Sequence, residues 1–143
     1  MATILELAKE MIDGRRQPAP IAALLGFRLT AVAPGRATVE LAADERLANP
    51  MGTLHGGVMC DIADAAMGMA FASTLDEGET FTTLELKINF VRAITQATGR
   101  VHAEGSVVHS GGRVATIEAR VHDDSGALYA HATSTCLILR GTR

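Results

Sequence analysis

The chain of 143 residues is poor in the side chains that several classes of protein need. It has no tryptophan, one tyrosine and four phenylalanines, so it offers no aromatic platform on which nucleic-acid bases could stack. Basic residues form no run, and the formal net charge of −3 argues against a nucleic-acid partner. No uninterrupted apolar stretch reaches about 18 residues, so no membrane-spanning helix is expected.

Metal-binding and export signals are also missing. The two cysteines, Cys60 and Cys136, lack metal-ligand spacing and are interpreted as small buried residues, although a nucleophilic Cys60 is an alternative. The histidines at positions 102, 109, 122 and 131 share no spacing, so we interpret them as structural and expect no metal site. No separate cofactor is expected either. The first 16 residues lack the order of regions found in a signal peptide, and we expect a cytoplasmic protein.

The hydrophobic content of 48% suits one domain with a substantial core. Helical spacing over Ile4 to Ile12, followed by Asp13-Gly14, predicts an N-terminal helix, and Pro18 and Pro20 predict a linker. We therefore expect a helix and linker over residues 1–18 and one main domain over residues 19–140.

An apolar stretch from Gly56 to about Ala72 contains Asp61 and Asp64 and predicts a central helix. At 100° per residue, Gly57, Asp61, Asp64 and Gly68 share one stripe about 60° wide. Carboxylates among apolar neighbours are costly to desolvate unless they are paired, protonated or used. The stripe is therefore expected to face a cleft or a partner; two exposed acids on a surface helix are the alternative.

The segment His55-Gly56-Gly57 lies at the start of this helix, where backbone N–H groups lack intrahelical partners. Such a group can hold the oxyanion that forms on a carbonyl under attack, a contribution of about 3 kcal/mol per donor. A tight turn before a helix is the simpler reading of the same triplet. Gly56 and Asp64 are separated by roughly 12 Å along one helix, too far to act on one group. If they cooperate, Gly56 of one subunit meets Asp64 of another across a two-fold axis.

The run Asn49-Pro50-Met51-Gly52-Thr53-Leu54-His55-Gly56-Gly57, with Asp64 nine positions after the histidine, resembles the hotdog-fold acyl-CoA thioesterases of the phenylacetate-degradation (PaaI-like) group. Shorter matches at Leu25-Gly26-Phe27, Asn89 to Arg92 and Gly126 to Ala130 extend the resemblance over nearly the whole chain.

The resemblance implies catalytic roles for four residues. Asp64 would act as general base on water or as nucleophile on the thioester carbonyl, and the Gly56 N–H would polarise that carbonyl. His55 and Asn49 match positions that shape the oxyanion site and the loop before the helix, and the alternative is that they form a hydrogen-bonded pair that fixes this loop.

Further residues are candidates for binding the substrate. Thr83 matches a position with a small hydroxyl residue near the attacking water; a solvent-facing threonine on a strand is the alternative. Gly57 adjoins the oxyanion donor. Asp61 could pair with a cation, raise the pKa of Asp64 or line the cleft. Arg92 and Arg113 are candidates for the coenzyme A phosphates; a solvated surface charge is the alternative for each.

Alternation and turn residues predict the remaining elements as strands. The expected strands cover residues 27–33, 36–42, 83–90, 99–109, 113–122 and 127–139. In the third of them Leu84, Leu86, Ile88 and Phe90 are expected on the buried face. Two early and four later strands around one helix predict an α+β hotdog domain, with one antiparallel sheet curled around that helix.

The resulting hypothesis is an acyl-CoA thioesterase that assembles as a homodimer or, through paired dimers, a homotetramer. A non-catalytic acyl-CoA-sensing hotdog module would need the pocket but not the acid. A hotdog hydratase or dehydratase is the third reading, and the proline-rich histidine motif that resembles those enzymes is absent. Pocket depth cannot be predicted from spacing, so aryl, short and medium acyl groups all remain open.

Overall fold

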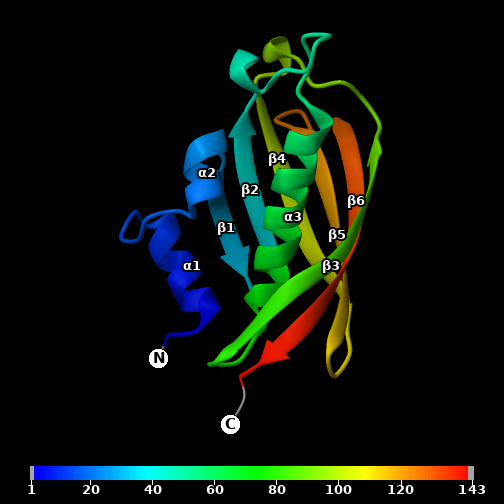
Figure 1. Ribbon diagram of the computed structural model, residues 1–143. Coiled ribbons are helices and arrows are strands. Elements are labelled where there is room, and N and C mark those ends of the chain that lie inside the picture. Colours follow the sequence, from blue (N-terminus) through cyan, green and yellow to red (C-terminus); the bar gives the residue numbers. More distant parts are fainter. Residues whose placement is uncertain (1, 142–143) are drawn as a thin grey trace.

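A six-stranded antiparallel sheet curls around the long helix α3 (Gly56–Ala72) in the computed structural model, which describes residues 2–141 (Figure 1). The strand order is β1-β2-β4-β5-β6-β3. The strands are β1 (Arg28–Ala33), β2 (Arg36–Ala42), β3 (Glu79–Phe90), β4 (Arg100–Ser110), β5 (Val114–Asp123) and β6 (Leu128–Arg140). This is the hotdog fold, and it confirms the predicted fold class and the predicted bounds of α3.

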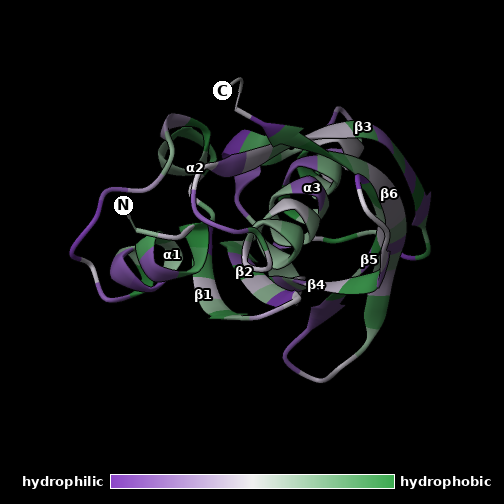
Figure 2. Cartoon of the chain, turned by 90° about the horizontal axis from the view of Figure 1, so that it is seen from below, coloured by the Kyte–Doolittle hydropathy of each residue, from purple (hydrophilic) through white to green (hydrophobic). Residues whose placement is uncertain are grey.

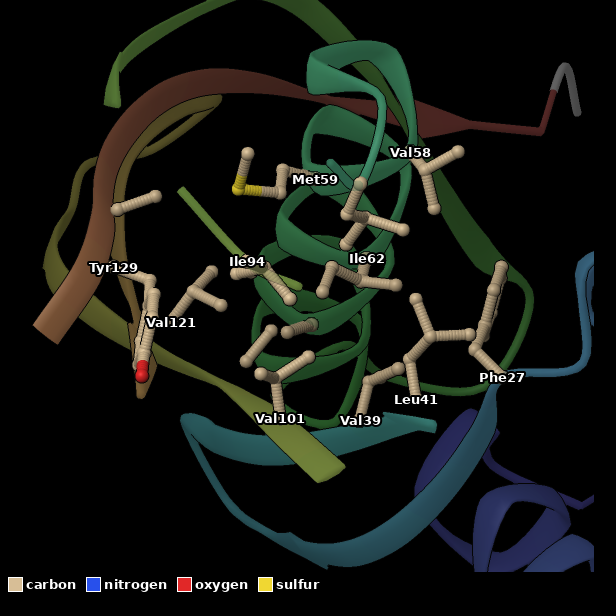
Figure 3. Packing of buried hydrophobic residues seen from close by; sticks show 14 of the residues in the cluster. Phe27, Val39, Leu41, Val58, Met59, Ile62, Ile94, Val101, Val121 and Tyr129 are labelled. Atoms are coloured by element: carbon tan, nitrogen blue, oxygen red, sulfur yellow. The ribbon is translucent and has the colours of Figure 1, made fainter. Parts of the chain in front are cut away.

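Small residues allow α3 to lie directly on the sheet. Ala63, Ala66 and Ala70 are fully buried. A Cβ atom on Gly105 of β4 would lie 2.3 Å from the carbonyl oxygen of Ala66, so the helix backbone rests on a position that only glycine can occupy. Larger apolar side chains, among them Leu41, Ile62 and Val101, pack in the same core cluster as Ala66 (Figure 3).

The strand β3 differs from the predicted alternation. Its pairing with β6 shifts register between Thr83 and Glu85, so one extra residue is accommodated at Leu84. Leu84 is therefore 55% exposed, whereas Leu86 and Ile88 are partly buried and pack against the core. The expectation that Leu84 and Phe90 are buried was wrong, since Phe90 is 53% exposed.

Two N-terminal helices lie outside the sheet. The helix α1 (Ile4–Ile12) matches its predicted bounds and is capped by Thr3 and Glu6. The helix α2 (Pro20–Leu25) was not predicted: Pro20 occupies its first turn, where proline is well tolerated, instead of belonging to a linker. Viewed along α3, the two helices lie beside the opening between β1 and β3 (Figure 2).

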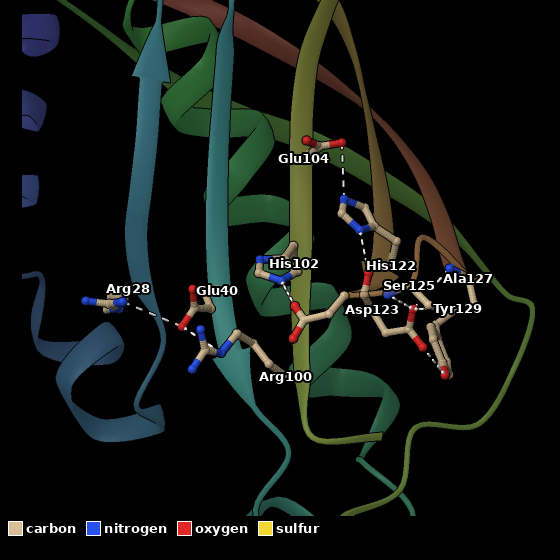
Figure 4. Close-up of polar contacts among 11 residues, drawn as sticks. Arg28, Glu40, Arg100, His102, Glu104, His122, Asp123, Ser125, Ala127 and Tyr129 are labelled. Atoms are coloured by element: carbon tan, nitrogen blue, oxygen red, sulfur yellow. Dashed lines mark hydrogen bonds and ion pairs between the residues drawn. The ribbon is translucent and has the colours of Figure 1, made fainter. Parts of the chain in front are cut away.

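The sheet face that points away from α3 is polar (Figure 4). Glu40 pairs with both Arg28 and Arg100, and His102 lies 2.6 Å from Asp124. His122 pairs with Glu104, and His131 pairs with Glu118. Three of the histidines expected to be structural, His102, His122 and His131, therefore have carboxylate partners. Within residues 2–141, no group of three or more His, Cys, Asp or Glu side chains is arranged to hold a metal ion.

The β5–β6 turn contains the most completely hydrogen-bonded carboxylate that the polar face offers. Asp123 accepts hydrogen bonds from the Ser125 hydroxyl and N–H, the Ala127 N–H and the Tyr129 hydroxyl. These donors, led by the Ser125 hydroxyl, lower the pKa of Asp123 to about 2.

Of the helices in the described part of the chain, none is long and apolar enough to cross a membrane.

Candidate active site

Hydrogen bonds fix the loop that leads into α3. Asn49 Oδ1 accepts from the N–H groups of Met51 and Thr53, and its Nδ2 donates to the Thr53 hydroxyl at 2.8 Å. His55 is the N-cap residue, and its Nδ1 accepts from the Gly57 N–H at 2.8 Å. Both side chains therefore hold the loop, although they do not bond to each other.

These bonds distinguish the two glycines of the triplet. The Gly57 N–H is already donated to His55, whereas the Gly56 N–H has no hydrogen-bond partner among the described residues. The ring of Phe90 covers Gly56, since a Cβ atom there would lie 3.0 Å from the ring. Any side chain at position 56 would press against this ring. The residue that carries the free N–H therefore has to be glycine if Phe90 is to stay in place.

A surface cleft of about 310 Å³ opens beside this N–H. Asn49, Gly56, Phe90 and Arg92 contribute to its walls. The Arg92 guanidinium lies 5.5 Å from the centre of the Tyr129 ring, so a cation is held at this end of the molecule. We call this cleft the glycine half-site.

The second group of predicted residues surrounds Asp64, in the middle of α3. The Thr83 hydroxyl of β3 donates a hydrogen bond of 3.0 Å to Asp64 Oδ1. Asp61 and Cys60 line the same cleft, which also measures about 310 Å³. We call this cleft the acid half-site.

The acid half-site is poor in groups that stabilise negative charge. Partial burial, assisted by the charge of Asp64, raises the pKa of Asp61. Burial likewise raises the pKa of the Cys60 thiol, with Asp61 and Asp64 adding to the effect. Because the thiolate is the nucleophilic form, this environment disfavours the alternative in which Cys60 attacks the substrate.

The two half-sites are separate within one chain. Gly56 and Asp64 are eight positions apart on α3, a rise of roughly 12 Å, and the two clefts share no lining residue. Arg113 lies on the β4–β5 hairpin and lines neither cleft. The structure therefore groups the predicted residues into two sets and leaves Arg113 apart from both.

Asp64 and Thr83 also border a larger apolar cavity of about 570 Å³, formed with residues of α1, α2 and β1. Sequence reasoning missed this contribution of the N-terminal helices. The amphipathic spacing of Ile4, Ala8, Met11 and Ile12 indicates a packed face, but it does not indicate what that face borders.

Comparison with known proteins agrees with the fold. Residues 51–130 match the model of the Thioesterase superfamily. The chain belongs to this superfamily.

Individual relatives support the same placement. The 1,4-dihydroxy-2-naphthoyl-CoA hydrolase of Listeria monocytogenes is 26% identical over 114 residues, 80% of this chain and 91% of that protein. The structure of a conserved protein from Pseudomonas aeruginosa has a TM-score of 0.80 and 31% identity, covering 85% of this chain and 95% of the other. A phenylacetic acid degradation-related protein of Ralstonia eutropha has a TM-score of 0.80 and 26% identity, covering 91% and 98%. The resemblance to the PaaI-like group is confirmed.

Proposed function

We propose that this protein is an acyl-CoA thioesterase whose active sites each combine the glycine half-site of one subunit with the acid half-site of another. The observation that carries the proposal is the pair of half-sites itself. One contains a free helix N-terminal N–H, and the other contains a carboxylate held by a hydroxyl group. The superfamily and the hydrolase relative that acts on a CoA thioester supply the reaction class.

The unpaired edge of strand β3 would allow two subunits to join their half-sites. This strand is the last in the sheet order, pairs with β6 on one side, and has no paired strand on the other within the described residues. Next to this edge, Leu84, Phe90 and Val91 are all more than half exposed. An unpaired edge twelve residues long is a template for another strand.

The register of such a pairing follows from the positions of the two half-sites. Phe90 lies over Gly56, and Thr83 bonds Asp64. In antiparallel pairing of two β3 strands, Phe90 opposite the partner's Thr83 also places Thr83 opposite the partner's Phe90. Both sites of the dimer would then be assembled by one two-fold axis between residues 86 and 87.

The chemistry assigned to each group is as follows. The Gly56 N–H of the partner subunit binds the carbonyl oxygen of the thioester. Asp64, with Oδ1 held by Thr83, accepts a proton from water through its other oxygen while the water oxygen bonds to the carbonyl carbon. The oxyanion collapses, the C–S bond breaks, and the thiolate leaves and takes up a proton. The products are the free acid and coenzyme A. Direct attack by Asp64 on the carbonyl is the alternative course.

The coenzyme A part of the bound substrate would extend from the thioester toward the glycine half-site. Arg92, which lines that cleft, would bind its phosphates. Arg113 belongs to the CoA site only if assembly brings a second subunit's hairpin to the cleft. Asp61 would line the entrance of the acid half-site. Its negative charge would repel anionic ligands that no cation of the protein binds.

The first experiment measures thiol release from phenylacetyl-, 4-hydroxybenzoyl- and straight-chain acyl-CoA esters, with the D64N variant alongside. We expect turnover that falls by about 10²-fold or more in D64N, the usual contribution of a positioned base. Binding of these esters without turnover by the wild-type protein would refute the enzyme and favour the sensing module.

A second experiment tests whether the sites are shared. G56P removes the N–H at the first helical position, where proline is tolerated, and the ψ of 133° at His55 suits a following proline. G56A is the matched control, because it adds the same contact with Phe90 but keeps the N–H. G56P is expected to be about 10²-fold or more slower than G56A.

Mixed dimers of G56P and D64N chains then contain one site with both intact groups. Activity should return in the mixed dimers, although each parent dimer is impaired. Verified mixed dimers that show no recovery would refute the cross-subunit site while leaving the thioesterase activity itself in place.

A further inference from the structure

The apolar cavity of about 570 Å³ lies between the N-terminal helices and the open side of the sheet. Figure 2 shows α1 and α2 beside the opening that β1 and β3 leave around α3. Ile4, Met11 and Ile12 of α1 and Ile21 of α2 form its outer wall. Its size falls within the usual range of small-molecule sites, about 300–1,000 Å³.

The cavity adjoins the acid half-site. Asp64 and Thr83 line both spaces, and the hydrogen bond between them stands at the junction. A thioester whose carbonyl carbon lies beside Asp64 can therefore extend its acyl group into the cavity while its sulfur points toward the surface cleft.

The course of the cavity along α3 gives its length. Asp64, Gly68 and Ala72 recur every four residues, so they follow one face of the helix, and all three line the cavity. The rise from Asp64 to Ala72 is roughly 12 Å. A zigzag alkyl chain with C–C bonds near 1.5 Å advances roughly 1.3 Å per bond, so this length holds about nine bonds.

The side chains that line the cavity favour some acyl groups over others. Among the described residues that line the cavity, Asp64 is the only acidic one, and the two arginines already have partners, Arg16 with Glu10 and Arg28 with Glu40. At the far end, Ile4 packs against the cluster that contains Ala72 and Phe71. That end offers methyl and methylene groups, which suit an alkyl tail and leave the hydroxyl group of a hydroxybenzoyl ester without a partner.

We infer that the N-terminal helices form the acyl-binding wall, and that the preferred substrate carries an unbranched acyl chain of about eight to ten carbons. This inference rests on the proposed function, because Asp64 marks where the thioester lies. The two helices lie outside residues 51–130, the part that matches the superfamily model. They would thus make acyl selectivity a property of the N-terminal segment.

The test measures kcat/KM for hexanoyl-, octanoyl-, decanoyl- and 4-hydroxybenzoyl-CoA. With the wild-type protein, kcat/KM should rise roughly two- to fourfold per added methylene up to about ten carbons, and the hydroxybenzoyl ester should be poorer than decanoyl-CoA. I4W, which fills the far end, should lower the value for decanoyl-CoA at least tenfold and change that for hexanoyl-CoA less than twofold.

Matched variants separate the pocket from general damage. L24W places the same bulky side chain on α2 at a position that is 70% exposed and outside the cavity, and it should not change the chain-length profile. A72L narrows the far end from the opposite wall and should act as I4W does. Circular dichroism and thermal melting identify a variant that fails to fold, in which case the other one supplies the test.

The two proposals fail in different ways. Hydrolysis with a flat chain-length profile that I4W leaves unchanged would overturn the acyl site and retain the thioesterase. Absence of hydrolysis would overturn the thioesterase. Calorimetric titration of the D64N chain then decides the acyl site: tighter binding of decanoyl-CoA than of hexanoyl-CoA, lost in D64N/I4W, supports it, and equal binding overturns it.

Discussion

The carboxylates of this protein occur in two contrasting settings. At the β5–β6 turn, Asp123 accepts four hydrogen bonds from residues no more than six positions away in sequence, and its pKa falls to about 2. On α3, Asp64 accepts one hydrogen bond from a distant strand, and the pKa of neighbouring Asp61 is raised by burial. Donors that are all local make a carboxylate a structural anchor, whereas a carboxylate short of donors keeps a lone pair free for a proton.

The largest expected difference between the two settings is in catalysis. D64N removes the proposed base and should lower kcat by about 10²-fold or more while leaving the melting temperature nearly unchanged. D123N should do the reverse, because Asp123 lines neither half-site. Steady-state kinetics and thermal melting of both variants check the contrast, which fails if D123N loses as much activity as D64N.

The next effect is the pH dependence of stability. The pKa of Asp123 is lower in the folded protein than its ordinary value of 3.8, so its contribution is complete above pH 4 and is lost as pH falls toward 2. D123N should therefore melt a few degrees lower than the wild-type protein at pH 7, and the gap should narrow between pH 4 and pH 2.

The control for this effect is D124N, which removes a carboxylate that is 72% exposed and whose one partner among residues 2–141 is His102. It should lower the melting temperature at pH 7 less than D123N does. A gap between D123N and the wild-type protein that stays constant down to pH 2 would contradict the structural role assigned to Asp123.

The smallest expected effect concerns Asp61. Its pKa is raised in the folded protein, so the ionised carboxylate destabilises the fold above the ordinary pKa, and the penalty disappears at lower pH, where the group is protonated in both states. D61N should raise the free energy of unfolding at pH 7 by a few tenths of a kcal/mol. The gain should vanish near pH 3 in urea titrations. A loss of stability at pH 7 would show that Asp61 has a favourable partner.

Patterns within single elements were enough to predict much of this protein. The apolar stretch predicted the bounds of α3. The spacing of Gly56 and Asp64 along one helix already indicated that one chain cannot bring them together. The strands were expected within a few residues of their ends, apart from the early start of β3. These features depend on helical rise, side-chain alternation and turn residues, which are local properties of the backbone.

Other features depended on contacts between residues far apart in sequence, and only the tertiary structure decided them. The bulge at Leu84 arises from pairing with β6, the need for Gly105 arises from the close approach of Ala66, and the cavity beside Asp64 arises from the packing of α1 and α2. The bond from Gly57 to His55 decided which glycine keeps a free N–H. By itself the sequence determined which groups could do the chemistry. The packing of separate elements decided which of them are free, and how much space lies beside the acid, because volume and register are set by both partners of a contact.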